Sequence, residues 1–267
     1  LASSAASDVY KRQEGQKMKR IGVLTSGGDT PGMNAAIRAV FKTGVDIDLQ
    51  VMGIYHGYKG LIEGRVGYLA HADVESKMHK GGTILRTARS EEFKTEGGIE
   101  KAISVLRAYE IEGLIVIGGD GSFKGADALS KRGIPVIGIP GTIDNDMGYT
   151  DFTIGFDTAV NNVMNEIYKI RDTMRAHDRV GVIEVMGRRC GDIALWAGVA
   201  GAADIILVPE RPLSWADAAN RLAANKLRGQ LTSIVMIAEG AGKAEDFCEY
   251  VRKYTDCLLY TSDAADE

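Results

Sequence analysis

Three short segments of this sequence combine glycine with hydroxyl and acidic residues. They read TSGGDTPGMN (25–34), GGDGS (118–122) and PGTIDND (140–146). Glycine lets a backbone N–H approach a phosphate closely, and the N-terminus of a following helix favours negative charge. One such segment is equally compatible with an ordinary tight turn between a strand and a helix. Three together favour a nucleotide site, although there is no GxxxxGK[ST] motif and no GxGxxG motif after the first strand.

The carboxylates of these segments could support phosphoryl transfer. An acid at Asp120 would repel phosphate unless a cation lay between them, and Mg²⁺ prefers one or two carboxylates plus phosphate oxygens. Asp144 and Asp146 share one loop, so one could orient a metal while the other accepts a proton from a hydroxyl nucleophile. Each of these aspartates could instead have a structural role, as a helix cap or in an Asx turn. Their place beside glycine-rich strand ends argues against that role for Asp120 and Asp144, and less so for Asp146.

Arginines near the same segments could bind phosphate oxygens. Arg89 lies in GGTILRTARSEEF (81–93), and Arg188 and Arg189 follow the stretch VIEVMG (182–187). Arginine presents a planar fork of donors to phosphate oxygens. Each could equally be a solvated surface charge, but the place of Arg188 beside Gly187 after a strand favours function.

Apolar strands that alternate with helices must position these residues. Strands are expected at 21–24, 51–55, 114–117, 134–139, 180–185, 205–208 and 234–238. Helical patterns cover 33–42, 123–131, 191–203 and 214–228, and a longer helix carries Val160, Val163, Met164, Ile167 and Met174. The alternation predicts an α/β fold of two Rossmann-like domains with mostly parallel sheets covered by helices. Ligands bind such sheets beyond the carboxyl ends of the strands, where the three segments fall.

We expect domains at 18–154 and 155–254, because the irregular segment 140–153 separates two sets of α/β units. The ends of the sequence have another expected origin. Back-translation of DVYKRQ (8–13) gives DNA whose reverse complement, in a shifted frame, encodes CLLYTS (257–262). The same DNA in both orientations is typical of a sequencing adaptor, so we expect 1–17 and 255–267 to be non-native.

Composition excludes several classes of protein. The formal net charge of −4 gives no overall basic field for nucleic acid, and no apolar run reaches the ~18 residues of a membrane helix. Three widely spaced cysteines form neither a disulfide framework nor a CxxC metal site, which indicates a reducing, cytoplasmic compartment.

The motifs together resemble one known family. TSGGDTPGMNAAIRA, GGTILRTARSEEF, IGGDGS, PGTIDND, IRDT and IEVMGR occur in the order and spacing typical of the bacterial 6-phosphofructokinases, from about residue 19 to 251. The resemblance implies transfer of the γ-phosphate of ATP to the 1-hydroxyl of fructose 6-phosphate, with Mg²⁺, in a homotetramer that responds to ADP or phosphoenolpyruvate. A noncatalytic, truncated fragment and a pyrophosphate-dependent relative are the alternatives.

The resemblance also implies a role for individual residues. Asp144 is the implied general base, Thr142 and Arg188 stabilise the transferring phosphoryl group, and Asp120 binds Mg²⁺. The implied ATP site consists of Gly28, Arg89, Ser90, Gly119, Asp120, Gly121 and Ser122. The implied contacts to fructose 6-phosphate come from Thr142, Ile143, Asp144, Arg179, Met186, Gly187, Arg188 and Glu239, and Arg179 reaches across a subunit interface in the family.

Two further comparisons with the family concern the donor and the regulatory site. The pyrophosphate-using relatives carry Asp and Lys where this sequence has Gly121 and Gly141, so the glycines favour ATP. The implied effector residues are Arg38, Lys42, Arg171, Asp204 and Arg228, and Asp204 could meet a Mg–diphosphate. His71, Gln230 and Leu231 stand where better-known members have basic residues.

Overall fold

The computed structural model describes residues 19–255 and 259–263, which form two compact units that divide between Gly141 and Thr142. The expected non-native lead, 1–17, lies outside the described residues. The units divide earlier than the expected boundary at residue 154, because residues 142–153 are bonded into the second unit. Asn145 Nδ2, for example, donates to Asp192 Oδ2 at 2.8 Å.

The first unit contains a mostly parallel sheet with the strand order β3-β2-β1-β4-β5. Its parallel strands are β1 (Arg20–Thr25), β2 (Gln50–Ile54), β4 (Gly113–Gly118) and β5 (Val136–Thr142), and the short β3 (Val66–Tyr68) runs antiparallel to β2. β1 is the central strand and is buried almost throughout, so its continuous apolar sequence correctly predicted a strand covered on both faces.

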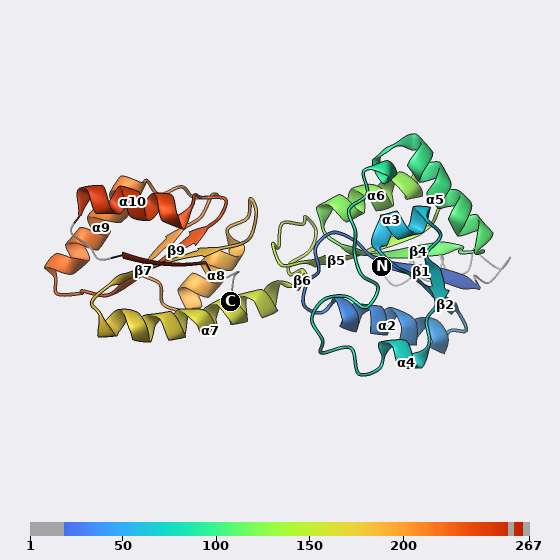
Figure 1. Cartoon of the computed structure of the whole chain (residues 1–267), viewed down its shortest axis with the longest axis horizontal. Helices are drawn as coiled ribbons and strands as arrows, with labels where there is room; N and C mark the ends of the chain where they lie inside the picture. Colours follow the sequence, from blue (N-terminus) through green and yellow to red (C-terminus); the bar gives the residue numbers. More distant parts are fainter. Residues whose placement is uncertain (1–18, 256–258, 264–267) are drawn as a thin grey trace, which may run out of the picture. The chain divides into compact units, whose positions relative to one another are not determined.

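Helices cover both faces of this sheet (Figure 1). One face carries α2 (Met33–Asp46) and α4 (His71–Val74). The other carries α3 (Gly57–Ile62), α5 (Glu96–Ala108) and α6 (Asp120–Ser130), and the short 3-10 turn η1 (Glu92–Lys94) precedes α5. Leu61, Phe93 and Leu106 from these helices and η1 pack with Leu24 and Val116 of the sheet in one buried cluster, which holds the carboxyl ends of β1 and β4 in place.

The second unit repeats the arrangement with the strand order β10-β7-β9-β8. Its elements are β6 (Ile154–Gly155), α7 (Phe156–Ala176), β7 (Val180–Val185), α8 (Asp192–Ala200), β8 (Ile205–Leu207), α9 (Trp215–Leu227), β9 (Ser233–Ala238), α10 (Ala244–Tyr254) and β10 (Leu259–Asp263). All pairings within this sheet are parallel. The expected α/β fold with mostly parallel sheets is therefore confirmed.

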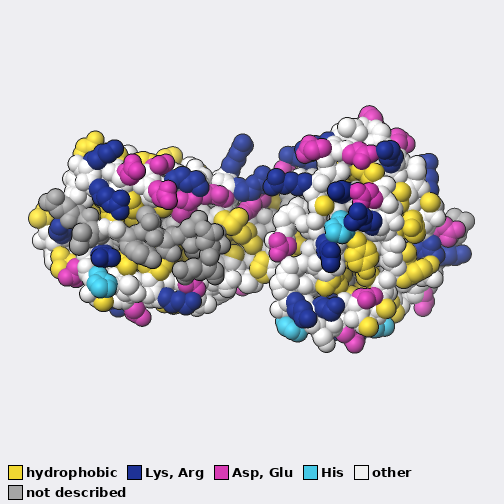
Figure 2. Space-filling model, in the orientation of Figure 1, with side chains coloured by type: hydrophobic (Ala, Val, Ile, Leu, Met, Phe, Trp, Pro, Cys, Tyr) yellow, Lys and Arg dark blue, Asp and Glu magenta, His cyan; other side chains and the backbone are white. Residues whose placement is uncertain are grey.

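Two buried clusters sandwich the sheet of the second unit. One lies under α7 and α8 and includes Phe156 and Ile167, and the other lies under α9 and α10 and includes Phe247. On each unit, basic and acidic side chains are interspersed over the face seen in Figure 2. Within 19–255 and 259–263, no helix is both long enough and apolar enough to cross a membrane.

Part of the expected non-native tail is built into the second sheet. Leu259–Asp263 form β10, which pairs in parallel with β7 from Val180 to Glu184, whereas 256–258 lie outside the described residues. Strand pairing uses backbone N–H and C=O groups, which almost any sequence supplies. The adaptor origin of this tail therefore stays a prediction.

Candidate functional site

Two of the three glycine-containing segments are bonded directly to each other in the first unit. Ser26 N donates to Ile117 O at 3.0 Å, and Ser122 Oγ donates to Ser26 O at 2.9 Å. Gly118 makes this approach possible, because a Cβ there would collide with the Ser26 carbonyl oxygen and lie 2.5 Å from Ser122 Oγ. The turns after β1 and β4 thus form one rigid platform at the carboxyl ends of adjacent strands.

The second of these turns is also a helix N-terminus. α6 begins at Asp120, three residues before the expected start at 123, with Gly119 as its N-cap. The N–H groups of its first turn are among those that an α-helix leaves without an internal partner, and they favour a negative ligand. A Cβ added to Gly121 would meet no atom within 4 Å, so the surface is open there.

Asp120 has the chemistry of a magnesium ligand. Its half-exposed carboxylate lies in this first turn and pairs with Lys124 Nζ at 2.7 Å. Among the described residues there is no cluster of three or more potential metal ligands. A single carboxylate beside a phosphate turn fits Mg²⁺, which takes most of its other ligands from phosphate oxygens and water.

The segment 80–90, which carries Arg89 and Ser90, is bonded to the same platform. Asn34 of α2 accepts from Ile84 N at 2.8 Å and donates to Lys80 O at 3.0 Å. Thr25 Oγ1 donates to Arg86 O at 3.0 Å. These bonds attach the segment to β1 and α2, whose connection contains Gly28. The structure therefore brings the first-unit candidates to one end of the sheet, with Arg89 itself exposed.

The third segment forms a compact acid–arginine cluster in the second unit. Asp144 is only 7% exposed, and its backbone N–H donates to Thr142 Oγ1 at 3.2 Å. Arg188 Nε lies 4.0 Å from Asp144 Oδ2, and Arg188 Nη1 lies 3.6 Å from Asp146 Oδ2. The expected base and the expected phosphoryl-binding arginine are thus neighbours.

A tight turn after β7 carries Arg188 and fixes its backbone. Gly187 has φ 143° and Arg188 has φ 55°, and both backbone N–H groups donate to Glu239 Oε1, at 3.0 and 2.5 Å. Burial, with the negative charges of Asp146 and Glu239, raises the pKa of Asp144 above its ordinary value, while Arg188 and Thr142 oppose the shift. A raised carboxyl pKa lies nearer the operating pH, as a general base requires.

The remaining sugar candidates have mixed surroundings. Met186 is 48% exposed directly after β7, beside the turn that carries Arg188. The side chain of Ile143 is partly buried and packs against the buried cluster under α7, so it supports the loop. Arg179 is partly buried just before β7 starts, at the opposite end of that strand from Arg188.

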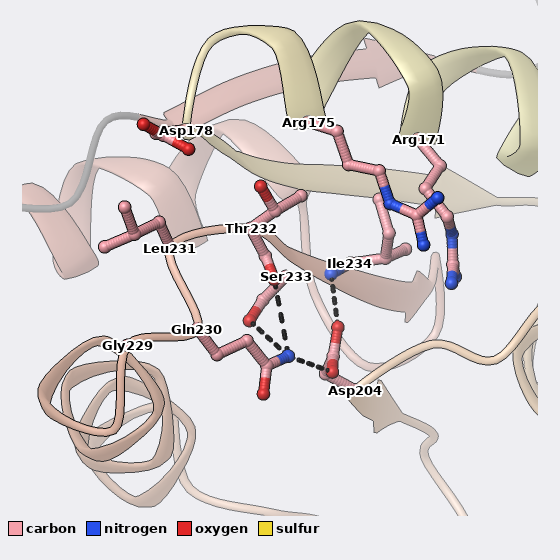
Figure 3. Close-up of a pocket in the computed structure, with 10 residues that line it drawn as sticks. All are labelled: Arg171, Arg175, Asp178, Asp204, Gly229, Gln230, Leu231, Thr232, Ser233 and Ile234. Atoms are coloured by element: carbon pink, nitrogen blue, oxygen red, sulfur yellow. Dashed lines mark hydrogen bonds between the residues drawn. The ribbon is translucent and has the colours of Figure 1, made fainter.

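The effector candidates fall in several places. Arg171 and Asp204 line one cavity of about 410 Å³, together with Arg175 and Gln230 (Figure 3). Arg228 is the C-cap of α9, one residue before the cavity lining resumes at Gly229. Arg38 and Lys42 lie on α2 of the first unit, where Lys42 Nζ is 3.8 Å from a Glu75 carboxylate oxygen.

The carboxylate expected to meet a metal in this cavity already has two partners. Gln230 Nε2 donates to Asp204 Oδ1 at 2.6 Å, and Ile234 N donates to Asp204 Oδ2 at 2.7 Å (Figure 3). Arg171 Nη2 donates to Ala202 O at 2.8 Å, while its buried Nε has no hydrogen-bond partner within the described part of the chain.

Sequence reasoning missed two residues of the acid–arginine cluster. Asn145 has φ 53°, and its side chain bonds to Asp192, Thr153 and the Asp151 carbonyl. Asn between two acids in a loop is a signal for a left-handed turn, since Asn tolerates that conformation better than most residues. Asp192 gave no separate signal, because Asp in the first turn of a helix is common.

Glycine-containing turns at strand ends and an acid–arginine cluster on α/β units fit the chemistry of a phosphotransferase. The family model described as Phosphofructokinase matches residues 20–263. The chain is 55% identical over 238 residues to the ATP-dependent 6-phosphofructokinase of Clostridium novyi and 54% identical to that of Clostridium botulinum. Each match covers 89% of this chain and 75% of the relative.

Solved structures agree with these matches. The phosphofructokinase of Saccharomyces cerevisiae superposes with a TM-score of 0.85 at 34% identity, over 92% of this chain and 38% of that one. A pyrophosphate-dependent phosphofructokinase from Marinobacter aquaeolei, at 24% identity and a TM-score of 0.81, shares the fold. The chain belongs to the phosphofructokinase family.

Proposed function

We propose that this chain transfers the γ-phosphate of ATP to the 1-hydroxyl of fructose 6-phosphate, giving fructose 1,6-bisphosphate and ADP. The observation that carries the proposal is the buried Asp144, with its raised pKa, beside the guanidinium of Arg188. The activity is that in the names of the Clostridium relatives, which this chain matches over 75% of their length.

The residues of the second unit would act on the acceptor. Asp144 takes the proton of the sugar 1-hydroxyl as the oxygen attacks the phosphorus. Arg188 and Thr142 stabilise the charge on the transferring phosphoryl group. Glu239 and the backbone of Met186 and Gly187 would contact the sugar, and Arg179 would bind its phosphate from a neighbouring subunit. In this role the raised pKa of Asp144 strengthens the base.

The platform of the first unit would hold the donor. The N–H groups at Gly119–Ser122 and the turn at Gly28 bind phosphate oxygens, with Arg89 and Ser90 at the nucleotide side. Asp120 would hold Mg²⁺, which neutralises phosphate charge when bound. The open space at Gly121 supports ATP over pyrophosphate, because an aspartate at 121 would repel the additional phosphate of a nucleotide.

The regulatory and quaternary roles are part of the same proposal. The cavity with Arg171 and Asp204 would take ADP or phosphoenolpyruvate, with Arg38, Lys42 and Arg228 as further contacts in a homotetramer. Because both oxygens of Asp204 have hydrogen-bond partners, a Mg–diphosphate would have to displace Gln230. A cytoplasmic location fits this glycolytic reaction.

The test is a donor-specific assay of fructose 1,6-bisphosphate formation. The assay uses two proteins: this 267-residue chain, and a hybrid in which the C-terminal quarter of the Clostridium novyi enzyme follows residue 255. ATP-dependent turnover in either protein supports the proposal. Preference for pyrophosphate would instead assign the chain to the pyrophosphate-dependent phosphofructokinases. Binding of nucleotide without turnover in both proteins would support a noncatalytic fragment.

A further inference from the structure

Asn145 lies between the two acids that face Arg188. Its φ of 53° is in the left-handed region, which Asn tolerates better than most residues. The turn there brings Asp144 and Asp146, one residue on either side, to within 4.0 and 3.6 Å of the same guanidinium. The conformation of Asn145 thus decides how Asp144 is presented.

The side chain of Asn145 uses both halves of its amide. Its Nδ2 donates to Asp192 Oδ2 at 2.8 Å and to the Asp151 carbonyl at 3.3 Å, and its Oδ1 accepts from Thr153 N at 3.0 Å. A carboxylate of the same shape could accept from Thr153 but could not donate to Asp192. The contact therefore requires an amide at 145 and an acceptor at 192.

The partner connects Asn145 to the segment that carries the arginine. Asp192 is the first residue of α8 and follows the turn at 187–191 that contains Arg188. The bond from Asn145 to Asp192 consequently joins the loop of Asp144 to the loop of Arg188. A change in this bond would therefore alter the distance between base and guanidinium.

We propose that Asn145, held by Asp192, is a positioning residue for Asp144. The proposal rests on the proposed function, in which Asp144 is the base. The carboxyl of Asp144 lies near Asp146, Glu239 and Arg188. Its burial and its charge environment therefore both depend on the conformation of the loop that carries Asn145. Misplacement of a reacting group by about 1 Å can cost on the order of 100-fold in rate.

Four variants separate this role from a purely structural one. Asn145→Gly keeps access to the left-handed conformation and removes the amide. Asn145→Asp keeps the shape but places two carboxylates against each other, and Asp192→Asn removes the acceptor. The double variant N145D/D192N restores a hydrogen bond with donor and acceptor exchanged. Thermal unfolding of each variant reports whether it is folded.

The expected results differ for geometry and charge. We expect Asn145→Gly to lower kcat about 10- to 100-fold with the KM for ATP within about twofold. The double variant should recover at least about tenfold in kcat over Asn145→Asp, by the same geometric argument. The acidic limb of the pH–rate profile of the double variant should lie at higher pH than that of the parent, because the new carboxylate at 145 adjoins Asp144. A kcat within about twofold for Asn145→Gly, or no recovery in the double variant, overturns the proposal.

A second measurement decides the case without turnover. Carboxyl ¹³C NMR follows the titration of Asp144 in the parent and in Asn145→Gly. We expect the pKa of Asp144 to fall toward its ordinary value in the variant, because the carboxyl is no longer held in its buried place. An unchanged titration overturns the positioning role. A parent chain and hybrid without fructose 6-phosphate kinase activity would instead overturn the proposed function.

Discussion

Replacing Asp144 by Asn should reduce activity and increase stability at the same time. The substitution keeps the size of the side chain but removes its ability to take a proton, and positioned acid–base groups contribute about 10²–10⁴-fold to rate. We expect kcat to fall by that range with little change in the KM for ATP. The measurement is initial-rate kinetics on the hybrid described above.

The stability gain follows from the direction of the pKa shift. Burial and two nearby acids make the ionised carboxylate unfavourable in the folded protein, so the pKa of Asp144 is raised. A raised pKa means that the stability contributed by this group is present at low pH and is lost as pH rises through the folded-state value. Asparagine resembles the protonated form, and therefore avoids this loss.

The size of the gain depends on how far the pKa is raised. Each tenfold difference in acid dissociation constant between the unfolded and folded protein corresponds to about 1.4 kcal/mol, and 1 kcal/mol raises Tm by about 2–4 °C in a protein of this size. We expect a higher Tm for Asp144→Asn at pH 7–8, with a difference that disappears below about pH 4. Scanning calorimetry across this range measures both.

Asp151→Asn is the matched control, because it makes the same change of charge on an exposed side chain of the same loop. Because this side chain is exposed, its replacement should change Tm less at neutral pH than Asp144→Asn does. A lower Tm for Asp144→Asn at neutral pH, or a kcat within about tenfold of the parent, would refute the assignment of Asp144 as a buried base with a raised pKa.

Three further changes test the other parts of the site. Asp120→Ala should weaken Mg–ATP in activity titrations, whereas Asp127→Ala, which breaks an equivalent ion pair in the same helix, should not; equal effects would exclude a metal role. Gly121→Asp should lower kcat/KM for ATP by about one to three powers of ten, since two charges 4 Å apart repel by about 1–4 kcal/mol. Adding Gly141→Lys should abolish ATP use but should also lower Tm, because a Cβ at 141 lies 3.1 Å from Ile117 Cγ2; efficient ATP use by the double variant would contradict the donor assignment. Arg171→Ala should remove the response of the rate to ADP or phosphoenolpyruvate while leaving kcat at saturation unchanged, and a retained response would exclude this cavity as the effector site.

The strands were predictable where burial makes the sequence continuously apolar. β7 begins and ends at the expected residues, and β1 extends the expected strand by one residue at each end. α5 was not anticipated, although Thr95 caps it through its hydroxyl and Ile99, Ala102, Ile103 and Leu106 form a buried helical face. Its two glycines near the start concealed the pattern, since glycine normally marks a turn.

The proximity of Asp144 and Arg188 was predictable, but the internal bonds of the site were not. The resemblance placed Asp144 and Arg188 in one function, and the structure brings them together. The bonds from Asn145 to Asp192 and from Ser122 to Ser26 join residues far apart in sequence, so no local pattern announces them. The partners of Asp204 were likewise hidden, because Gln230 and Ile234 approach it only after β9 pairs with β8.

The close approach at Gly118 constrains how this family can diversify. Any side chain at 118 would separate the Ser26 carbonyl from the Ser122 hydroxyl, and a larger residue at 122 would act on the same space. The residue types at 118 and 122 are therefore conditional on each other, whereas any residue at 26 supplies the carbonyl oxygen. In an alignment of many homologues, 118 and 122 should change together or not at all, while the neighbouring position 121, which faces open space, should vary with donor class.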